Sequence, residues 1–329
     1  MGNRIFLGVD LGGTNTKFAL VQEGGEVLER SSIRTKAMRK PEEVVDDIAS
    51  EAQRLLAIAR KKEREVPALG IGIPGRIDWE EGICYLLPNF PNKWYQVPIR
   101  QWLEDRVGLP VGVINDVRAI TLAEKRFGAG RDVESMAMVA IGTGVGGGVV
   151  LNGELVIGQH GSAGELGHIT VEAGGTECGC GNRGCLEAYA TGPAMVAAAI
   201  RAVVQQNDTL IRDLAEGDLN RVTTKVVSQA IAAGDRIAME IMQRIGEYIG
   251  QAVANVYVTI DPELIVIGGG VSRAGEPLMD SIRKGIKKRL FMVPWESVRL
   301  VRAELDMDAG TIGTATWAKE RLGKNKIRK

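Results

Sequence analysis

The sequence has no excess of charge of either sign and no long apolar run. Its 41 basic and 41 acidic side chains balance, so nothing in the charge favours nucleic acid or a membrane surface as a partner. No uncharged run of about eighteen apolar residues occurs, which argues against a transmembrane helix. The apolar stretch before Asp10 is too short for a secretory signal. We therefore expect a cytoplasmic protein.

Two familiar nucleotide-binding patterns are also missing. Gly323-Lys324 lacks the upstream glycines and the following Ser or Thr of a Walker A loop. Residues 142–147 formally match the dinucleotide fingerprint, but the β-branched residues after them predict a strand where that fingerprint needs a helix. An NAD-dependent dehydrogenase is thereby disfavoured. The length of 329 residues predicts about two domains.

Glycine-rich hairpins occur twice. Residues 4–21 read as an apolar strand ending near Asp10, a turn at Gly12-Gly13 and a second strand. Backbone N–H groups in such a turn can bind phosphate oxygens, with Thr14 and Thr16 as further donors. This segment could also be an ordinary hairpin with no ligand. Residues 136–158 repeat the pattern around Thr143 and Gly144, which predicts a duplicated domain with two phosphate loops.

Cysteine and histidine are scarce, with four and two in the chain, yet four of these six residues lie close together in sequence. They are His168, Cys178, Cys180 and Cys185. Thiolate and imidazole ligands suit a closed tetrahedral zinc site. The alternatives are a disulfide with a spare thiol, or buried inert cysteines. The remaining Cys84 is expected to be a small buried hydrophobe.

Two further strand ends carry candidate site residues. Asn115-Asp116 follows an apolar strand and precedes a helical pattern, a place where open α/β sheets bind ligands. The other interpretation is a helix N-cap. Gly268, Gly269 and Gly270 follow a second apolar strand, which indicates either a nucleotide-binding junction or a plain strand-to-helix turn.

Helices are predicted over residues 41–64 and 99–107, after Asp116, and over 311–322. Residues 188–204 and 225–257 are rich in alanine and in helix formers. We expect residues 298–305 and the closing helix to return to the first domain.

The motifs DLGGTNTK, PNF, IND, GTGVGGG, ELGH, CGCGNRGCLE and IGGGVS occur in this order over nearly the whole chain. This series resembles the ROK family, which comprises sugar kinases and repressors with a two-domain actin-like ATPase (ribonuclease H-like) α/β fold. The resemblance implies a cleft between a small domain of residues 1–117, with 305–329 packed back on it, and a large domain of residues 118–304 with the zinc loop. It also implies a homo-oligomer, a dimer or a tetramer.

The resemblance further implies an ATP-dependent kinase that uses Mg²⁺ and zinc and phosphorylates glucose to glucose 6-phosphate in glycolysis. Asp116 is then the catalytic base. The implied sugar-binding set is Asn89, Asn115, Asp116, Glu165, His168 and Glu187. The implied nucleotide and magnesium set is Asp10, Gly12, Gly13, Thr14, Thr143, Gly144, Gly268, Gly269 and Gly270.

Two alternatives remain at this point. N-acetylglucosamine, N-acetylmannosamine, mannose or allose could replace glucose, and polyphosphate could replace ATP. A sugar-sensing repressor of the same family normally carries an N-terminal winged helix, whereas only nine residues precede Asp10 here. An intact Asp116 favours the kinase.

Overall fold

The structure is a computed structural model and describes residues 4–87, 90 and 94–325. It consists of two compact units, each described separately below. Unit 1 comprises residues 1–132, 152–163 and 304–329, and unit 2 comprises residues 133–151 and 164–303. Unit 1 thus extends beyond the predicted boundary at residue 117, because helix α3 (Asp116–Phe127) packs on the C-terminal helix α9 (Ala309–Asn325). Among the described residues, no helix is long and apolar enough to cross a membrane.

Unit 1 is built on one five-stranded sheet of order β3-β2-β1-β4-β7. Its strands are β1 (Ile5–Leu11), β2 (Asn15–Gln22), β3 (Val27–Arg34), β4 (Leu69–Ile73) and β7 (Val111–Asn115). β1 pairs antiparallel with β2 and parallel with β4, which is in turn parallel to β7. A small hairpin of β5 (Arg76–Asp78) and β6 (Ile83–Leu86) lies outside this sheet.

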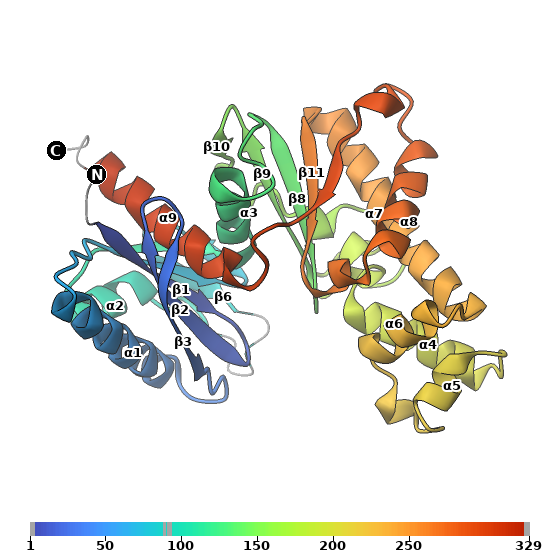
Figure 1. Cartoon of the computed structure of the whole chain (residues 1–329), viewed down its shortest axis with the longest axis horizontal. Helices are drawn as coiled ribbons and strands as arrows, with labels where there is room; N and C mark the ends of the chain where they lie inside the picture. Colours follow the sequence, from blue (N-terminus) through green and yellow to red (C-terminus); the bar gives the residue numbers. More distant parts are fainter. Residues whose placement is uncertain (1–3, 88–89, 91–93, 326–329) are drawn as a thin grey trace. The chain divides into compact units, whose positions relative to one another are not determined.

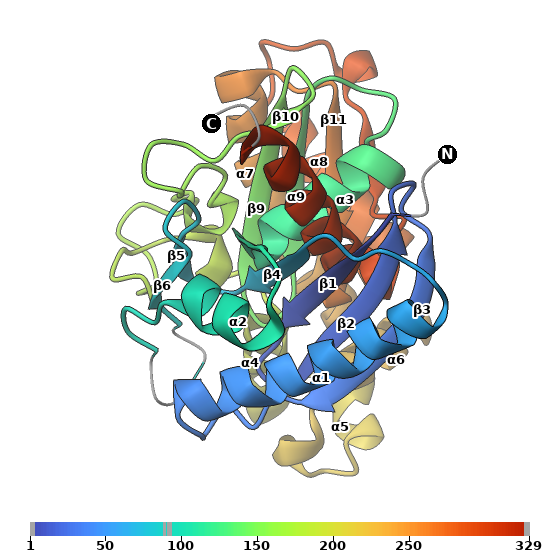
Figure 2. The same cartoon turned by 90° about the vertical axis from the view of Figure 1, so that its left-hand side faces the viewer.

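Helices cover both faces of this sheet (Figure 1, Figure 2). Because side chains alternate along a strand, Leu7 and Val9 of β1 face α1 (Pro41–Lys61) and α2 (Ile99–Val107), whereas Phe6 faces α9. All three helices were predicted near these positions. Cys84 is fully buried among the side chains on the α1 side, as expected.

Glycines let α9 approach the sheet closely. A Cβ atom on Gly8 would lie 1.9 Å from the carbonyl oxygen of Thr311, and one on Gly70 would lie 1.8 Å from that of Thr314. Neither distance can be tolerated, so glycine is required where the helix crosses β1 and β4. This contact confirms that the closing helix returns to the first unit.

Unit 2 repeats the arrangement. Its strands β8 (Met136–Ile141), β9 (Val145–Leu151), β11 (Leu264–Gly268) and β12 (Leu300–Arg302) have the order β9-β8-β11-β12. The hairpin is antiparallel and the next two pairings are parallel, as in β2-β1-β4-β7. The predicted duplication is therefore present. The expectation that residues 298–305 return to the first unit was wrong for β12, because it pairs with β11.

The helices of unit 2 are α4 (Gly192–Val204), α5 (Leu210–Leu214), α6 (Thr224–Ala232), α7 (Arg236–Ile260) and α8 (Glu276–Lys287). α7 and α8 pack closely, because Gly246 and Gly250 leave room for Ser281 and Ile282. α4 packs on α6 and α7. The short strand β10 (Glu154–Leu155) follows β9 where the chain returns to unit 1.

Candidate functional site

The first phosphate hairpin has the predicted form. Asp10 is the sixth residue of β1, and the turn that follows leaves Gly13 and Thr14 exposed. Burial raises the pKa of the Asp10 carboxyl group, and the nearby Lys17 opposes this shift. Lys17 was missed by the sequence analysis, although the hairpin register pairs it with Asp10.

One expected phosphate donor is not available. Thr16 is fully buried, and its hydroxyl lies 3.0 Å from that of Thr35, which donates to the carbonyl oxygen of Gly12 at 2.7 Å. The prediction for Thr16 was therefore wrong, because alternation along β2 turns this side chain into the protein. Its role is to fix the hairpin.

Asp10 also lies against the N-terminal turn of α9. A Cβ atom on Gly310 would be 2.6 Å from Oδ2 of Asp10, so the carboxylate and the helix start are in close contact. Helix N-termini favour negative charge. Sequence analysis missed Gly310, because a single glycine in a helical pattern gives no signal for a partner 300 residues away.

Asn115 and Asp116 were expected to form either a ligand-binding pair or a helix N-cap. Asn115 is the N-cap of α3, where its Oδ1 accepts from the N–H groups of Val117 and Arg118 at 3.1 and 3.2 Å. Its Nδ2 donates to the carbonyl oxygen of Gly75 at 3.4 Å. Asp116 is the first residue of the helix, and its Oδ1 accepts the N–H of Val117 at 2.9 Å. The cap is thus supplied by Asn115, and Asp116 is placed at the carboxyl end of β7.

The second phosphate hairpin, between β8 and β9, has Thr143 exposed at its turn. The N–H of Val145 donates to Oε2 of Glu187 at 2.9 Å, and a Cβ atom on Gly144 would lie 2.6 Å from the same oxygen. One predicted sugar-binding carboxylate is therefore fixed directly to a predicted phosphate loop.

The glycines after β11 lie beside this hairpin, because β11 runs parallel to β8. Gly269 has a φ of 80°, and a Cβ atom there would lie 2.3 Å from the carbonyl oxygen of Ile141. Gly270 is exposed with open space around it. Gly268 is the buried last residue of β11, so Gly269 and Gly270 alone form an accessible backbone surface next to the phosphate hairpin of unit 2.

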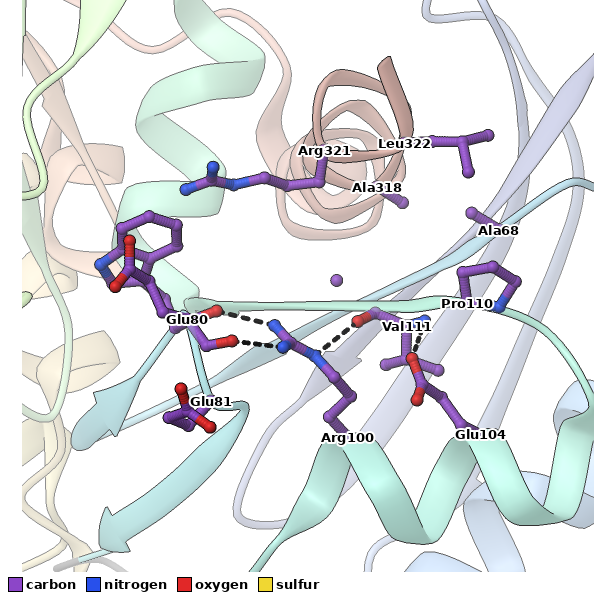
Figure 3. A pocket seen from close by; sticks show the side chains of 12 residues that line it. Ala68, Glu80, Glu81, Arg100, Glu104, Pro110, Val111, Ala318, Arg321 and Leu322 are labelled. Atoms are coloured by element: carbon purple, nitrogen blue, oxygen red, sulfur yellow. Dashed lines mark hydrogen bonds between the residues drawn. The ribbon is translucent and has the colours of Figure 1, made fainter. Parts of the chain in front are cut away.

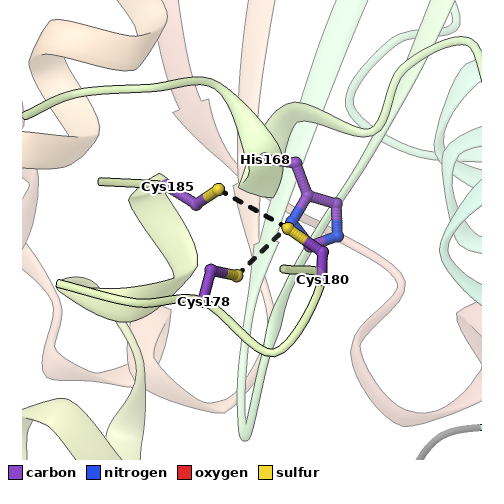
Figure 4. A group of neighbouring side chains, drawn as sticks. All are labelled: His168, Cys178, Cys180 and Cys185. Carbon is purple, nitrogen blue, oxygen red and sulfur yellow. Dashed lines mark hydrogen bonds between the residues drawn. The ribbon is translucent and has the colours of Figure 1, made fainter. Parts of the chain in front are cut away.

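The predicted zinc ligands come together, as Figure 4 shows. The ligand atoms of His168, Cys178, Cys180 and Cys185 all lie within 4.8 Å of one another. Sγ of Cys180 is 3.7 Å from Sγ of Cys185, and Sγ of Cys178 is 3.8 Å from Nδ1 of His168. All of these cysteines are free thiols, so the disulfide alternative is not observed.

These distances fit a zinc ion. Bonds of about 2.3 Å to sulfur in a tetrahedron place two sulfur atoms about 3.8 Å apart. Burial raises the pKa of the Cys178 thiol, and a bound metal ion would stabilise its thiolate form. His168 turns Nδ1 toward the cluster and keeps Nε2 for another partner.

The cluster is continuous with the sugar-binding candidates. Oε1 of Glu187 lies 3.8 Å from Sγ of Cys178, and Glu165 immediately precedes the short helix Leu166–His168. Asn89 lies outside the described residues. In unit 2 the structure thus brings Glu187 and the zinc ligands together with Thr143 and Gly144, while Asp10 and Asp116 lie in unit 1.

Two well-defined pockets do not contain the predicted site residues. A cavity of about 360 Å³ in unit 1 is lined by Trp79, Glu80, Arg100, Glu104 and Arg321, among others (Figure 3). Arg100 donates there to the carbonyl oxygens of Trp79, Glu80 and Val111, so this guanidinium group is already bound by the backbone. A groove of about 750 Å³ in unit 2 lies between α4, α7 and the segment around Glu172.

Comparisons with known proteins agree with this arrangement. The sequence model of the ROK family matches residues 6–321. The glucokinase of Thermotoga maritima is 38% identical over 317 residues, which is 96% of this chain and 98% of that protein.

Two solved structures are also similar. A ROK family glucokinase from Streptomyces griseus, in complex with glucose and AMPPNP, has a TM-score of 0.81 at 34% identity, covering 96% of this chain and 99% of that one. A ROK family transcriptional regulator, a homolog of the E. coli MLC protein, has a TM-score of 0.87 at 31% identity, covering 97% and 78%. The two-domain actin-like ATPase fold is confirmed, and the chain belongs to the ROK family.

Proposed function

We propose that this chain is an ATP-dependent glucokinase that transfers the γ-phosphoryl group of ATP to the 6-hydroxyl of glucose. The observation that carries this proposal is the position of Asp116. Its carboxylate is at the first turn of α3 and at the carboxyl end of β7, and Asn115 supplies the helix cap in its place. Glucokinase relatives at 34–38% identity over nearly the full length support the same activity.

Asp116 would act as the general base. Asp116 is the first residue of α3, and helix N-termini favour negative charge. It would orient the sugar hydroxyl and take its proton as the phosphoryl group is transferred. Phosphoryl transfer requires mostly positioning and charge stabilisation, so one well-placed carboxylate is enough protein chemistry at the acceptor side.

The nucleotide would be bound by the two hairpins. Asp10 would hold Mg²⁺ through water, and Gly13 and Thr14 would donate to phosphate oxygens, as would Thr143 and Gly144. The N–H of Gly12 instead donates to the carbonyl oxygen of Asn15 at 3.2 Å, which shapes the turn. The exposed backbone at Gly269 and Gly270, which follow the buried Gly268, would accept the adenosine part. Mg²⁺ would neutralise charge on the phosphates, which is the chemistry that it supplies in kinases.

The sugar would be recognised by hydrogen bonds from Asn89, Asn115, Asp116, Glu165, His168 and Glu187. Zinc held by His168, Cys178, Cys180 and Cys185 would be structural, because all four positions of a tetrahedral site are then occupied by protein. The fixed loop would aim Nε2 of His168 and the carboxylate of Glu187 at sugar hydroxyls.

A coupled ADP-release assay across a hexose panel tests the proposal. Glucose should give the highest kcat/KM among glucose, mannose, allose, N-acetylglucosamine and N-acetylmannosamine. A higher value for another hexose would reassign the substrate within the same activity. Binding of a sugar without ADP release from any of them would instead favour a sugar-sensing regulator, as the similarity to a ROK regulator allows. The same assay with polyphosphate in place of ATP tests the phosphoryl donor. Analytical ultracentrifugation tests the expected homo-oligomer.

A further inference from the structure

Helix α3 contacts unit 1 residues that lie at, or within three residues of, each connection between the two units. The four connections lie at residues 132–133, 151–152, 163–164 and 303–304. All of the contacts below lie within unit 1. They come from Arg118, Glu124 and Arg126, which the proposed mechanism does not use.

Glu124 contacts the segments next to two connections. Its side chain is fully buried, and its carboxylate accepts the N–H of Ala129 at 2.9 Å, just before the first connection. It also accepts the N–H groups of Glu304 and Leu305 at 3.2 and 2.9 Å, just after the last one. Gly128 leaves the room for this, since a Cβ atom there would lie 2.1 Å from Oε2 of Glu124.

The two arginines contact the remaining connections. Nη1 of Arg126 donates to the carbonyl oxygen of Gly153 at 2.9 Å, just after the second connection. Nε and Nη2 of the buried Arg118 donate to the carbonyl oxygen of Ala163 at 3.1 and 3.0 Å, at the third connection. Bidentate contact by a charged donor is a strong and directional hydrogen bond.

The helix that bears these contacts is itself rigidly held. A Cβ atom on Gly313 of α9 would lie 1.8 Å from the carbonyl oxygen of Ala119, so the two helix backbones touch. Asp116 is the first residue of this helix. Any pull that a moving unit 2 exerts through its connections therefore acts on the element that carries the proposed base.

We propose that Arg118, Glu124 and Arg126 are positioning residues that hold the unit 1 end of each connection on the helix of Asp116, so that movement of unit 2 does not displace this carboxylate. They fix the unit 1 end of each connection to α3, so the units rotate about defined points and Asp116 keeps its place as the sugar is enclosed. Loosening one contact should widen the range of unit positions and lower the population of the binding-competent one. The catalytic part of this inference rests on the proposed glucokinase function, whereas the hinge part does not.

Matched pairs of variants test the coupling. Arg126→Gln removes both the bond to Gly153 and the ion pair with Glu320 at 2.9 Å, whereas Glu320→Gln removes only the ion pair. Glu124→Gln turns an amide N–H toward backbone donors. Its control is Glu104→Gln, because Glu104 also accepts a backbone N–H, from Val111 at 2.9 Å, at no connection.

The readout is the distribution of distances between the units. Spin labels are placed at the exposed positions Ala57 and Gln229 through a non-natural ketone amino acid, which spares the metal-site thiols, and labelled protein is diluted with unlabelled chain. The measurement is made well below the melting temperature of each variant. Without sugar, Arg126→Gln and Glu124→Gln should broaden the distribution of distances between the labels. With glucose and ATP, their glucose KM should rise by about tenfold, because the competent state is less populated. The two controls should stay within about twofold of the parent.

The inference would be overturned if Arg126→Gln and Glu124→Gln gave the same distance distributions and glucose KM values as their controls. Equal broadening of the distributions in the controls would also overturn it. If Glu124→Gln does not fold, the pair at Arg126 and Glu320 still decides. If the parent does not phosphorylate glucose, the proposed function fails, but the distributions measured without sugar still test the hinge.

Discussion

The role proposed for Asp116 is tested by Asp116→Asn. The amide keeps the shape of the side chain but cannot accept the proton, so kcat should fall by a factor of about 10² to 10⁴. Sugar affinity, measured by calorimetry, should stay within a few-fold of the parent. A variant that keeps a kcat within about threefold of the parent would remove Asp116 from the mechanism.

Individual side chains differ in how much of their position the sequence predicts. The clustering of His168 with the three cysteines, and the place of Asp116 at a strand end, were predicted because each follows a local pattern. Thr16 was misassigned, because its exposure depends on which way β2 faces. Gly310 and Glu124 were missed, since their partners are about 180 to 300 residues away and no local pattern records them.

Cys84 gives a prediction for stability against pH. Burial raises the pKa of its thiol from 9.0 to about 11. The folded state therefore disfavours the thiolate. The contribution of the neutral Cys84 thiol to the free energy of unfolding is fully present below pH 9 and is lost as the pH rises toward 11. The loss should approach about 2–3 kcal/mol. Urea unfolding of the parent and of Cys84→Ala should show a steeper alkaline decline in the parent, and parallel curves would contradict it.

At the scale of elements, the sequence predicted most of the fold. Most helices and both glycine-rich hairpins were expected, because each has a continuous periodic pattern with recognisable ends, whereas α5 and α8 were not predicted. The pairing of β12 was not, because a three-residue strand can add to either sheet and tertiary contacts decide which. The close approach of α9 was also hidden, since glycines at alternate strand positions read only as weak strand formers.

Close packing of α9 should make the glycines beneath it intolerant of any side chain. Gly70→Ala places a methyl group 1.8 Å from the carbonyl oxygen of Thr314, so the helix must shift. We expect a loss of about 1–3 kcal/mol or more in the free energy of unfolding. Gly24→Ala is the control, because a Cβ atom there meets nothing within 4 Å. Equal melting temperatures of the two variants would show that α9 is not packed in this way.

The zinc loop should couple metal to sugar recognition. Cys180→Ser removes one of four ligands, so elemental analysis should fall from about one zinc per chain to near none. Glucose KM should then rise much more than ATP KM, because the hairpins proposed to bind ATP contain none of the metal ligands. Cys84→Ala should keep the metal, since Cys84 is outside the cluster. A zinc-free parent with normal activity would refute the organising role of this loop.

At the scale of the whole molecule, the residues proposed for catalysis are divided between two units, with Asp10 and Asp116 in unit 1 and Thr143, His168 and Glu187 in unit 2. A single substrate complex needs both sets, so the units are expected to move together when sugar binds. Small-angle scattering at saturating glucose should show a smaller radius of gyration than without sugar. An unchanged profile would argue against closure.

Phosphoryl transfer from ATP to the 6-hydroxyl of glucose is tested most directly by observing its two products. Phosphorus NMR of the purified protein with ATP, Mg²⁺ and glucose should show ADP and glucose 6-phosphate appearing in equal amounts. With 6-deoxyglucose, which lacks only the accepting hydroxyl, no sugar phosphate should form. Absence of a sugar phosphate from glucose, or transfer to 6-deoxyglucose at a similar rate, would contradict the account.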